Sequence, residues 1–359
     1  MSDWVDVGAA GDLAKSAVTR CVTPTAKLAV SFRDGVFGAV GSACNHAGGP
    51  LGQGTLDGDD IVCPWHQWRF HRCSGQGAAA HGNVPSYPVK VENGRVLVDL
   101  AAATPRVGAK RTPHPLARPV ERAPGPLRLA GISTTAMDPA HPRFSGSDHL
   151  LNIALEGAAA DGAETRLLRL DDLKFHACRG YYSKAARACT WPCSITQLHA
   201  DDELTAVYEA LVHWADAIVV ATPIRWGSAS SLYFKMAERL NCIQNAITTH
   251  DRVLIRNKVA GFIIVGGQDN IQSVAGQMIG FFAELGFLFP QFPYIAHSRG
   301  WSHEDMENNV EMVRTSPELA EGARELARRC LDRAGELLAS AGTPAVISRG
   351  GRKANAGHG

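Results

Sequence analysis

The chain has 359 residues, a length that predicts two or three domains. Hydrophobic residues make up 45% and charged residues 20%, so the composition excludes collagen-like, coiled-coil and wholly disordered proteins. The formal net charge is +1 and no apolar run reaches the roughly 18 residues of a membrane span, so neither nucleic acid nor a membrane is expected as a partner.

The first hundred residues are predicted to form β-structure. Residues 27–40 (KLAVSFRDGVFGAV) and 89–100 (VKVENGRVLVDL) each place two strand-like runs around an Asp-Gly or Asn-Gly pair. These pairs supply the positive φ angles that a tight hairpin needs. Residues 101–126 contain six prolines and are expected to form an extended linker.

After Leu127, predicted strands alternate with predicted helices. Strands are expected over 127–133, 164–170, 217–221, 259–267 and about 287–296, and helices over 148–161, 201–215, 229–240, about 271–285 and about 316–339. Five such alternations predict a parallel sheet with helices on both faces. The expected organisation is therefore an all-β domain (1–100), a linker (101–126), an α/β domain (127–340) and a flexible Gly-rich tail (341–359).

The nine cysteines are odd in number and irregular in spacing, and the first residues lack the features of a secretory signal. A disulfide framework is not expected in such a chain. The cysteines are instead interpreted as free thiols or metal ligands of a cytoplasmic protein.

Two Cys-His pairs lie in the first domain. Cys44 and His46 are followed by Cys63 and His66, in the spacing C-x-H-x16-C-x2-H. Two thiolates suit a ferric iron, and two imidazoles suit the second iron of a [2Fe–2S] pair. A structural zinc site is the alternative, but a zinc finger keeps its two cysteines together and its two histidines together on a helix. Mixed pairs among predicted hairpins therefore favour an iron–sulfur cluster.

The segments CNHAGGPLGQG and CPWHQWRF, with the closing hairpin PSYPVKVENGRVLV, resemble the cluster-binding loops and last hairpin of a Rieske domain. The pattern is most similar to Rieske ferredoxins and to the Rieske domains of ring-hydroxylating oxygenases. Rieske proteins of respiratory complexes carry an extra cysteine in each loop, where this sequence has Gly49 and Trp65. The resemblance implies a lower-potential [2Fe–2S] cluster held by the two Cys-His pairs. Elsewhere the spacing predicts no mononuclear iron site of two histidines and one carboxylate, so the chain is not expected to be a terminal oxygenase.

Three loops that follow predicted strands carry candidate cofactor ligands, because ligands of a doubly wound sheet bind beyond the carboxyl ends of its strands. In the first loop, hydroxyl groups and an arginine precede a helix N-terminus, which either binds a phosphate or is an ordinary capped helix start. The second loop, TPIRWGS, would place amides and an aromatic ring beside a planar ligand, and glycines in the third allow close backbone approach. The candidate residues are Ser133, Thr134, Thr135, Arg143, Ser145, Ser147, Thr222, Pro223, Ile224, Arg225, Trp226, Gly227, Gly266, Gly267 and Gln268.

Together these loops, above all TPIRWGS, resemble the NAD(P)H-dependent FMN reductase branch of the flavodoxin-like superfamily, over residues from about 127 to 300. The resemblance implies a flavodoxin-like domain with a five-stranded parallel sheet, FMN and NAD(P)H as cofactors, and a homodimer or homotetramer. The insertion TAMDPAH departs from it. Iron–sulfur flavoproteins of this branch carry a tight four-cysteine motif, whereas this chain has Cys178, Cys189 and Cys193. A second cluster is therefore expected less than a redox-active pair or plain, partly buried thiols.

The combination predicts an NAD(P)H-dependent oxidoreductase with FMN and a Rieske centre that passes electrons to a partner protein such as an oxygenase. A nicotinamide delivers two electrons as a hydride and a Rieske cluster accepts one, so a flavin is the expected intermediary. In one alternative the flavin site reduces a small organic substrate, such as a quinone, nitro or azo compound, with the Rieske domain as electron inlet. In the other, the protein is a redox-sensing module without turnover. No residue is assigned a catalytic role.

Overall fold

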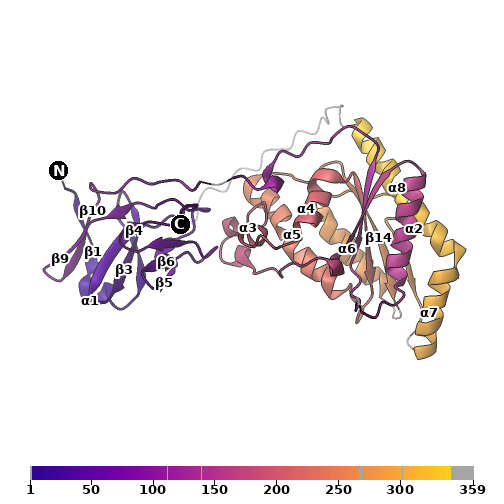
Figure 1. Ribbon diagram of the computed structural model, residues 1–359, viewed down its shortest axis with the longest axis horizontal. Coiled ribbons are helices and arrows are strands. Elements are labelled where there is room, and N and C mark those ends of the chain that lie inside the picture. The colour runs from indigo at the N-terminus through magenta and orange to yellow at the C-terminus, as the bar shows by residue number, and fades with distance from the viewer. Residues whose placement is uncertain (1, 111, 139, 267–269, 301, 341–359) are drawn as a thin grey trace. The chain divides into compact units, whose positions relative to one another are not determined.

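The structure is a computed structural model that describes residues 2–110, 112–138, 140–266, 270–300 and 302–340 (Figure 1). Its internal contacts divide it into two compact units. The first comprises Met1–Pro119, His176–Asp202 and Arg239–Arg252, and the second comprises Val120–Phe175, Glu203–Glu238 and the chain from Val253 onward. The predicted domain boundaries stay a prediction. The contacts group residues 176–202, which were predicted to belong to the α/β domain, with the N-terminal region. The predicted tail, 341–359, lies outside the described residues.

The N-terminal part of the first unit is built from three antiparallel sheets. In spatial order, the first sheet contains β1 (Trp4–Ala9), β10 (Arg95–Asp99) and β9 (Val89–Glu92). The second contains β2 (Val18–Val22), β3 (Lys27–Arg33), β4 (Val36–Gly41) and β8 (Ser86–Tyr87). The third contains β5 (Thr55–Asp57), β6 (Asp60–Val62) and β7 (Arg69–His71). Both predicted hairpins are confirmed, since β3 pairs with β4 and β9 with β10. Their turn residues have the positive φ angles that Asp-Gly and Asn-Gly provide: 49° and 80° at Asp34 and Gly35, and 51° and 72° at Asn93 and Gly94.

Short helical segments complete the first unit. They are α1 (Ala10–Leu13), η1 (Leu51–Gln53), η2 (Pro115–Ala117), η4 (Tyr181–Ser183), η5 (Ala186–Ala188) and α3 (Ser194–Leu198), together with the C-terminal half of α5 (Ser231–His250). One apolar core of this unit contains Leu51, Ile61 and Phe70. The buried residues Cys44 and Cys63 belong to the same apolar core. The predicted cluster ligands are therefore anchored on a packed core.

The second unit contains a five-stranded parallel sheet in the order β12, β11, β13, β14, β15. The strands are β11 (Arg128–Ser133), β12 (Glu164–Arg169), β13 (Ala217–Pro223), β14 (Val259–Gly266) and β15 (Tyr294–Ser298). This order, 2-1-3-4-5, is that of flavodoxin-like proteins and confirms the predicted fold class. The last strand begins later than predicted, because Pro290 and Pro293 supply no N–H groups to a sheet.

Helices cover both faces of this sheet (Figure 1). Helices α2 (Gly146–Ala160) and α8 (Pro317–Ser340) share one apolar core with Val259, Ile263 and Val265 of β14. Side chains alternate along a strand, so Phe262 faces the other way, where it contacts Phe282 of α6 (Ile271–Leu285) at a ring-centroid distance of 5.5 Å.

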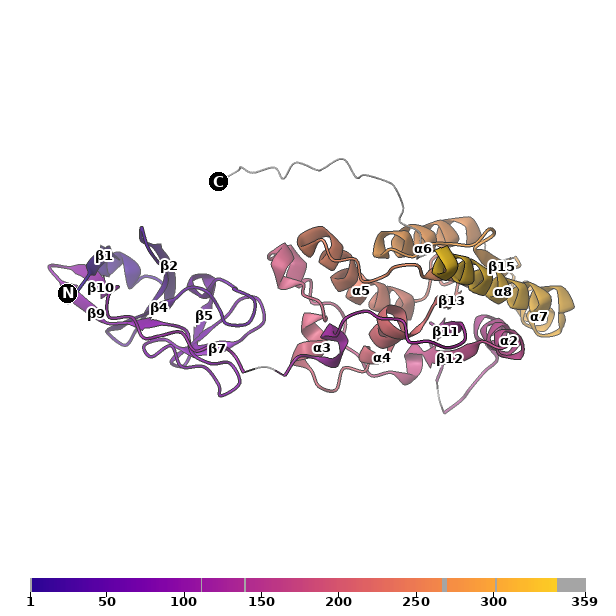
Figure 2. The ribbon, with the colours of Figure 1, turned by 90° about the horizontal axis from the view of Figure 1, so that it is seen from above.

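Further helical segments of the second unit are η3 (Leu170–Asp172), α4 (Thr205–Tyr208), the π-helical turn η6 (Glu209–Trp214) and α7 (His303–Thr315). Helix α7, which lies beside α2 (Figure 2), was not predicted because its sequence is mostly polar. Its start was nevertheless readable, since Ser302 and Asp305 form a capping box. Among the described residues, no helix combines the length and apolarity needed to span a membrane.

Candidate cofactor sites

The two predicted Cys-His pairs lie on loops with the same backbone design. One loop follows β4 and the other connects β6 to β7. In each loop the cysteine N–H donates to the carbonyl five residues later, at 2.9 Å for Cys44 and 2.8 Å for Cys63, and the cysteine carbonyl accepts from the N–H four residues later, at 3.0 Å in both. The residues at that fourth position, Gly48 and Gln67, have φ angles of 76° and 59°. The loops therefore present their cysteines in equivalent positions.

The four predicted ligand side chains meet where these loops face each other. The buried thiols of Cys44 and Cys63 share a hydrogen bond, which lowers the pKa of Cys63 to about 7 and raises that of Cys44. Backbone N–H groups of Trp65 and His66 also lower the pKa of Cys63 by donating to its sulfur. The rings of His46 and His66 lie 4.1 Å apart, centroid to centroid. Two thiols and two imidazoles thus converge, as a [2Fe–2S] cluster of mixed ligation requires.

Gly49 allows the two loops to approach this closely. A Cβ atom at this position would lie 2.7 Å from the sulfur of Cys63 and 3.1 Å from the ring of Trp65. Gly49 and Trp65, which stand where respiratory Rieske proteins have their extra cysteines, are therefore in direct contact. In the described part of the chain, none of the nine cysteines forms a disulfide.

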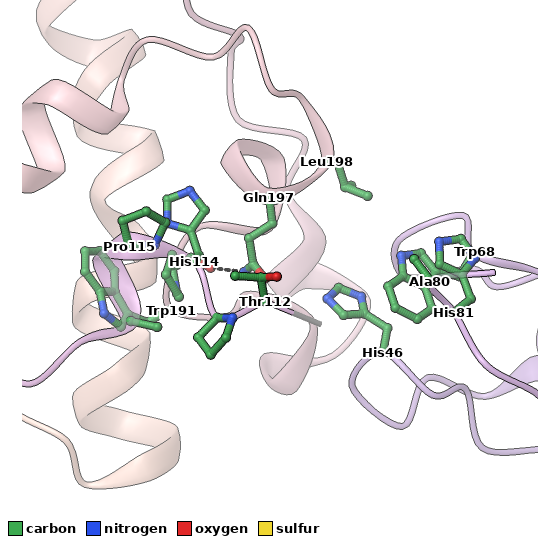
Figure 3. Close-up of a pocket in the computed structure, with 13 residues that line it drawn as sticks. His46, Trp68, Ala80, His81, Thr112, His114, Pro115, Trp191, Gln197 and Leu198 are labelled. Atoms are coloured by element: carbon green, nitrogen blue, oxygen red, sulfur yellow. Dashed lines mark hydrogen bonds between the residues drawn. The ribbon is translucent and has the colours of Figure 1, made fainter. Parts of the chain in front are cut away.

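The two imidazoles have different surroundings. The Nε2 atom of His66 donates to the carbonyl of Ala188 at 2.7 Å, and its ring packs edge-on against Tyr181. Because this bond occupies Nε2, the buried Nδ1 atom is the ring nitrogen of His66 that could bind a metal. His46 instead stacks on Trp68 and lines a cavity of about 730 Å³ that also includes Trp191 (Figure 3).

A second cavity, of about 430 Å³, lies in the second unit beyond the carboxyl ends of β13 and β14. Eight of the predicted FMN-site residues line it: Thr135, Arg143, Ser145, Ser147, Pro223, Ile224, Arg225 and Gly266. Three of their hydroxyl groups form one cluster, in which Thr135 Oγ1 lies 2.9 Å from Ser145 Oγ and 3.1 Å from Ser147 Oγ. Ser145 is also the N-cap of α2, so the cluster lies at the positive end of a 15-residue helix.

The charges around this cavity favour an anion. The described lining residues include two arginines and no carboxylate. Burial lowers the pKa of Arg225, and the positive charge of Arg143 lowers it further. An anion between these groups would relieve their repulsion. Hydroxyls, guanidinium groups and a helix N-terminus together form a donor set suited to a phosphate.

Other predicted FMN-site residues do not line the cavity. Ser133, Thr134 and Thr222 are buried in the framework beneath it, where Ser230 Oγ donates to the carbonyl of Thr134 at 2.6 Å and Ser230 N–H donates to Thr222 Oγ1 at 3.1 Å. Trp226 is 92% exposed and sits with Gly227 in a turn of positive φ angles. Gly267 and Gln268 lie outside the described residues.

The cavity also contains a polar residue that the sequence did not reveal. Asn309 of α7 lines it with only 6% of its surface exposed, and its Oδ1 atom has no hydrogen-bond partner among the described residues. Gly146 allows close packing there, since a Cβ atom would lie 3.0 Å from side-chain atoms of Val265 and Val313. The one sequence signal that could have pointed to Asn309 is the capping box at the start of α7, which predicts a helix there.

Three further cysteines lie near η5 in the sequence, and each accepts a hydrogen bond from an N–H group. The donors are Gly180 N for Cys178 (3.4 Å), Asn241 Nδ2 for Cys189 (3.5 Å) and Arg239 Nε for Cys193 (3.3 Å). Burial is the main cause that raises the pKa of Cys189 to about 11. Cys189 is therefore a protonated thiol at neutral pH, which disfavours its prediction as half of a reactive redox pair.

The family model of the Rieske [2Fe–2S] domain matches residues 3–88. The ferredoxin component of a naphthalene 1,2-dioxygenase system from Pseudomonas putida is 34% identical over 100 residues, which cover 27% of this chain and 96% of that protein. The chain belongs to the Rieske ferredoxin family. Another ferredoxin component, from the p-cumate 2,3-dioxygenase system of the same species, is 34% identical over 106 residues, 28% of this chain and 90% of that protein.

The Rieske domain of this chain is joined to a second matched domain. The family model of NADPH-dependent FMN reductases matches residues 140–302. An iron–sulfur flavoprotein of Methanocaldococcus jannaschii is 28% identical over 219 residues, 59% of this chain and 97% of that protein. The protein is thus an FMN-dependent oxidoreductase with an iron–sulfur centre, and its cofactors are a Rieske [2Fe–2S] cluster, FMN and NAD(P)H.

Proposed function

We propose that this protein passes electrons between a nicotinamide, FMN and its Rieske cluster, and from there to a partner protein such as an oxygenase. The observation that carries this proposal is the presence, in one chain, of two matched Cys-His loops and of a cavity lined by arginines and hydroxyls at the strand ends of a flavodoxin-like sheet. The ferredoxin components of dioxygenase systems that resemble the first domain support an oxygenase as partner.

In this proposal Cys44 and Cys63 bind one iron, and the Nδ1 atoms of His46 and His66 bind the other. The cavity of the second unit holds the phosphate of FMN. Ser145 and its hydroxyl neighbours donate hydrogen bonds to that phosphate, while Arg143 and Arg225 neutralise its charge. When bound, FMN supplies the chemistry that connects two-electron hydride transfer to one-electron transfer.

The phosphate assignment is testable through ligand preference. Replacing Arg143 by Met removes one of two positive charges, so the variant is expected to lose most of its preference for FMN over riboflavin, which has no phosphate. Arg333→Met, on an exposed face of α8, is the matched control and should leave the preference unchanged. Fluorescence titration of the flavin-free protein measures both affinities. Unchanged discrimination in the Arg143 variant would place the phosphate elsewhere.

Electron flow is tested by titrating the anaerobic holoprotein with NADPH, and then NADH, while recording visible absorbance and low-temperature EPR. We expect the flavin to bleach and a Rieske EPR signal to grow with it. The Cys44→Ser variant should still bleach its flavin but show no Rieske signal, while Cys73→Ser, an exposed cysteine of the same domain, should behave as the parent.

If neither nicotinamide reduces either cofactor, the proposed direction is wrong. Reduction by a reduced ferredoxin, followed by consumption of a quinone, nitro or azo compound, would then identify the Rieske domain as the electron inlet. Partner affinity that differs between the oxidised and reduced protein, without turnover, would identify a redox sensor.

We further propose that the protein is cytoplasmic, because its nine cysteines form no disulfide. We also propose that it assembles as a homodimer or homotetramer, as the resemblance to FMN reductases implies. Light scattering of the holoprotein tests the assembly, and a monomer at micromolar concentration would contradict it.

A further inference from the structure

Two histidines and a carboxylate come together in the first unit, apart from the four cluster ligands. They are His176, His199 and Asp201, whose nearest ligand atoms all lie within 4.8 Å of one another. The rings of the two histidines are 4.3 Å apart, and His176 Nε2 lies 3.9 Å from Asp201 Oδ1. Spacing in the sequence did not reveal this group, because the fold brings the three side chains together.

A buried ion pair holds both segments that carry these side chains. Arg239 Nη1 donates to Asp202 Oδ2 at 2.7 Å, and neither side chain is exposed to solvent. The same nitrogen donates to the carbonyl of His176 at 2.7 Å, and Asp202 Oδ2 accepts from the His176 N–H at 3.4 Å. The N–H of Asp202 donates to the carbonyl of His199 at 3.1 Å. The backbone beside each histidine is therefore fixed before any ligand arrives.

The side chains themselves are accessible to a ligand. His176 and His199 are half-buried, while Asp201 is exposed. Ligand atoms around a tetrahedral zinc ion lie roughly 3.3 Å apart, given bond lengths of about 2.0–2.1 Å. The three ligand atoms, which lie within 4.8 Å of one another, would have to approach by up to about 1.5 Å to bind one such ion. Asp202 is engaged by Arg239 and is no candidate ligand, so Asp201 supplies the negative charge of the site.

We propose that His176, His199 and Asp201 bind a divalent transition-metal ion, with Zn²⁺ as the probe. Two imidazoles and one carboxylate are a donor set that such ions prefer. Three protein ligands leave at least one coordination position open to water or to a small anion. The site goes beyond the proposed function and does not depend on it.

The test is equilibrium dialysis of the holoprotein, with its cluster and flavin bound, against buffered Zn²⁺. We expect saturable binding of one zinc per chain. His199→Ala and Asp201→Asn should each weaken this binding by about tenfold or more. His303→Ala is the matched control, because His303 also contacts a carboxylate, Glu307 at 3.1 Å, but has no second imidazole in that pair. Iron and flavin content of every variant must equal that of the parent, which verifies that the variants fold.

X-ray absorption at the zinc edge distinguishes this site from the thiols near η5. The proposal requires nitrogen and oxygen neighbours at about 2.0–2.1 Å and no sulfur at about 2.3 Å. Zinc bound by sulfur would overturn it, and so would equal zinc affinity in the parent and the His199→Ala variant. In the latter case His176 and Asp201 form only a surface ion pair.

Discussion

At the level of single residues, Gly49 determines whether the two Cys-His loops can close on a cluster. We predict that Gly49→Ala lowers the iron and sulfide content of the purified protein severely, because the added methyl group would lie 2.7 Å from the sulfur of Cys63. Gly11→Ala is the control, since a Cβ atom at Gly11 meets nothing within 4 Å. Iron and sulfide analysis with EPR measures the outcome, and full cluster content in Gly49→Ala would contradict the ligand assignment.

Asn309 offers a comparable test of the second cavity. A carboxylate at this buried position would repel a bound phosphate, so Asn309→Asp is expected to weaken FMN binding by about tenfold, or about 1.4 kcal/mol. The adjacent Asn308 is exposed, and Asn308→Asp introduces the same charge outside the cavity. Fluorescence titration with FMN compares the two variants. Equal affinities would show that α7 does not contribute to the flavin site.

At the level of elements, Arg239 connects α5 to the segments before and after α3, through hydrogen bonds to His176 and Asp202. Beyond Asp202 and His176, its guanidinium donates to Thr196 Oγ1 at 2.7 Å and to the sulfur of Cys193 at 3.3 Å. One buried side chain thus connects segments that lie more than forty residues apart in the sequence.

Removing this guanidinium would leave the Asp202 carboxylate buried without its cation. We predict that Arg239→Met lowers the free energy of unfolding of this unit by about 3–5 kcal/mol. Arg333→Ala breaks an exposed pair with Glu336 and should cost less than about 1 kcal/mol. Urea denaturation followed by circular dichroism compares the variants. Similar midpoints would mean that other contacts hold these segments together.

At the level of the whole molecule, stability is expected to depend on pH through Lys258, the residue before β14. Burial lowers the pKa of Lys258 to about 8, while its ammonium group donates to the carbonyl of Ala215. Between pH 8 and the usual lysine pKa of about 10.4, the unfolded chain binds a proton that the folded chain has released. Folding therefore becomes more favourable as the pH rises through this window, by at most about 3 kcal/mol, and this contribution is absent below pH 8.

Lys258→Met removes that titration. The stability difference between the parent and the variant should thus shift in favour of the parent as the pH increases from 7.5 to 9.5. Urea unfolding at several pH values measures the difference, and a difference that is constant over this range would show that Lys258 titrates normally. Lys27→Met, at an exposed position of β3, is a control for the loss of a lysine.

The sequence by itself determined both domain types and the two Cys-His pairs that are predicted to bind the cluster. Each Cys-His pair is local, so a few residues suffice to predict the ligands. The hairpin turns are set by Asp-Gly and Asn-Gly pairs whose φ preferences are intrinsic. The strands β11, β13 and β14 were readable because buried parallel strands form continuous apolar runs. Fifteen FMN-site candidates followed from the position of loops after strands, and eight of them line the cavity.

Only the tertiary structure decided which side chains share a site. Thr134 and Thr135 are adjacent and chemically alike. Thr134 is nevertheless held in the framework by Ser230, whereas Thr135 lines the cavity. Asn309 reaches the same cavity from a polar helix more than 150 residues after Thr135. His176, His199 and Asp201 meet because a buried ion pair from α5 holds their backbones together. Contacts of this kind arise from packing between distant segments, which local sequence patterns do not encode.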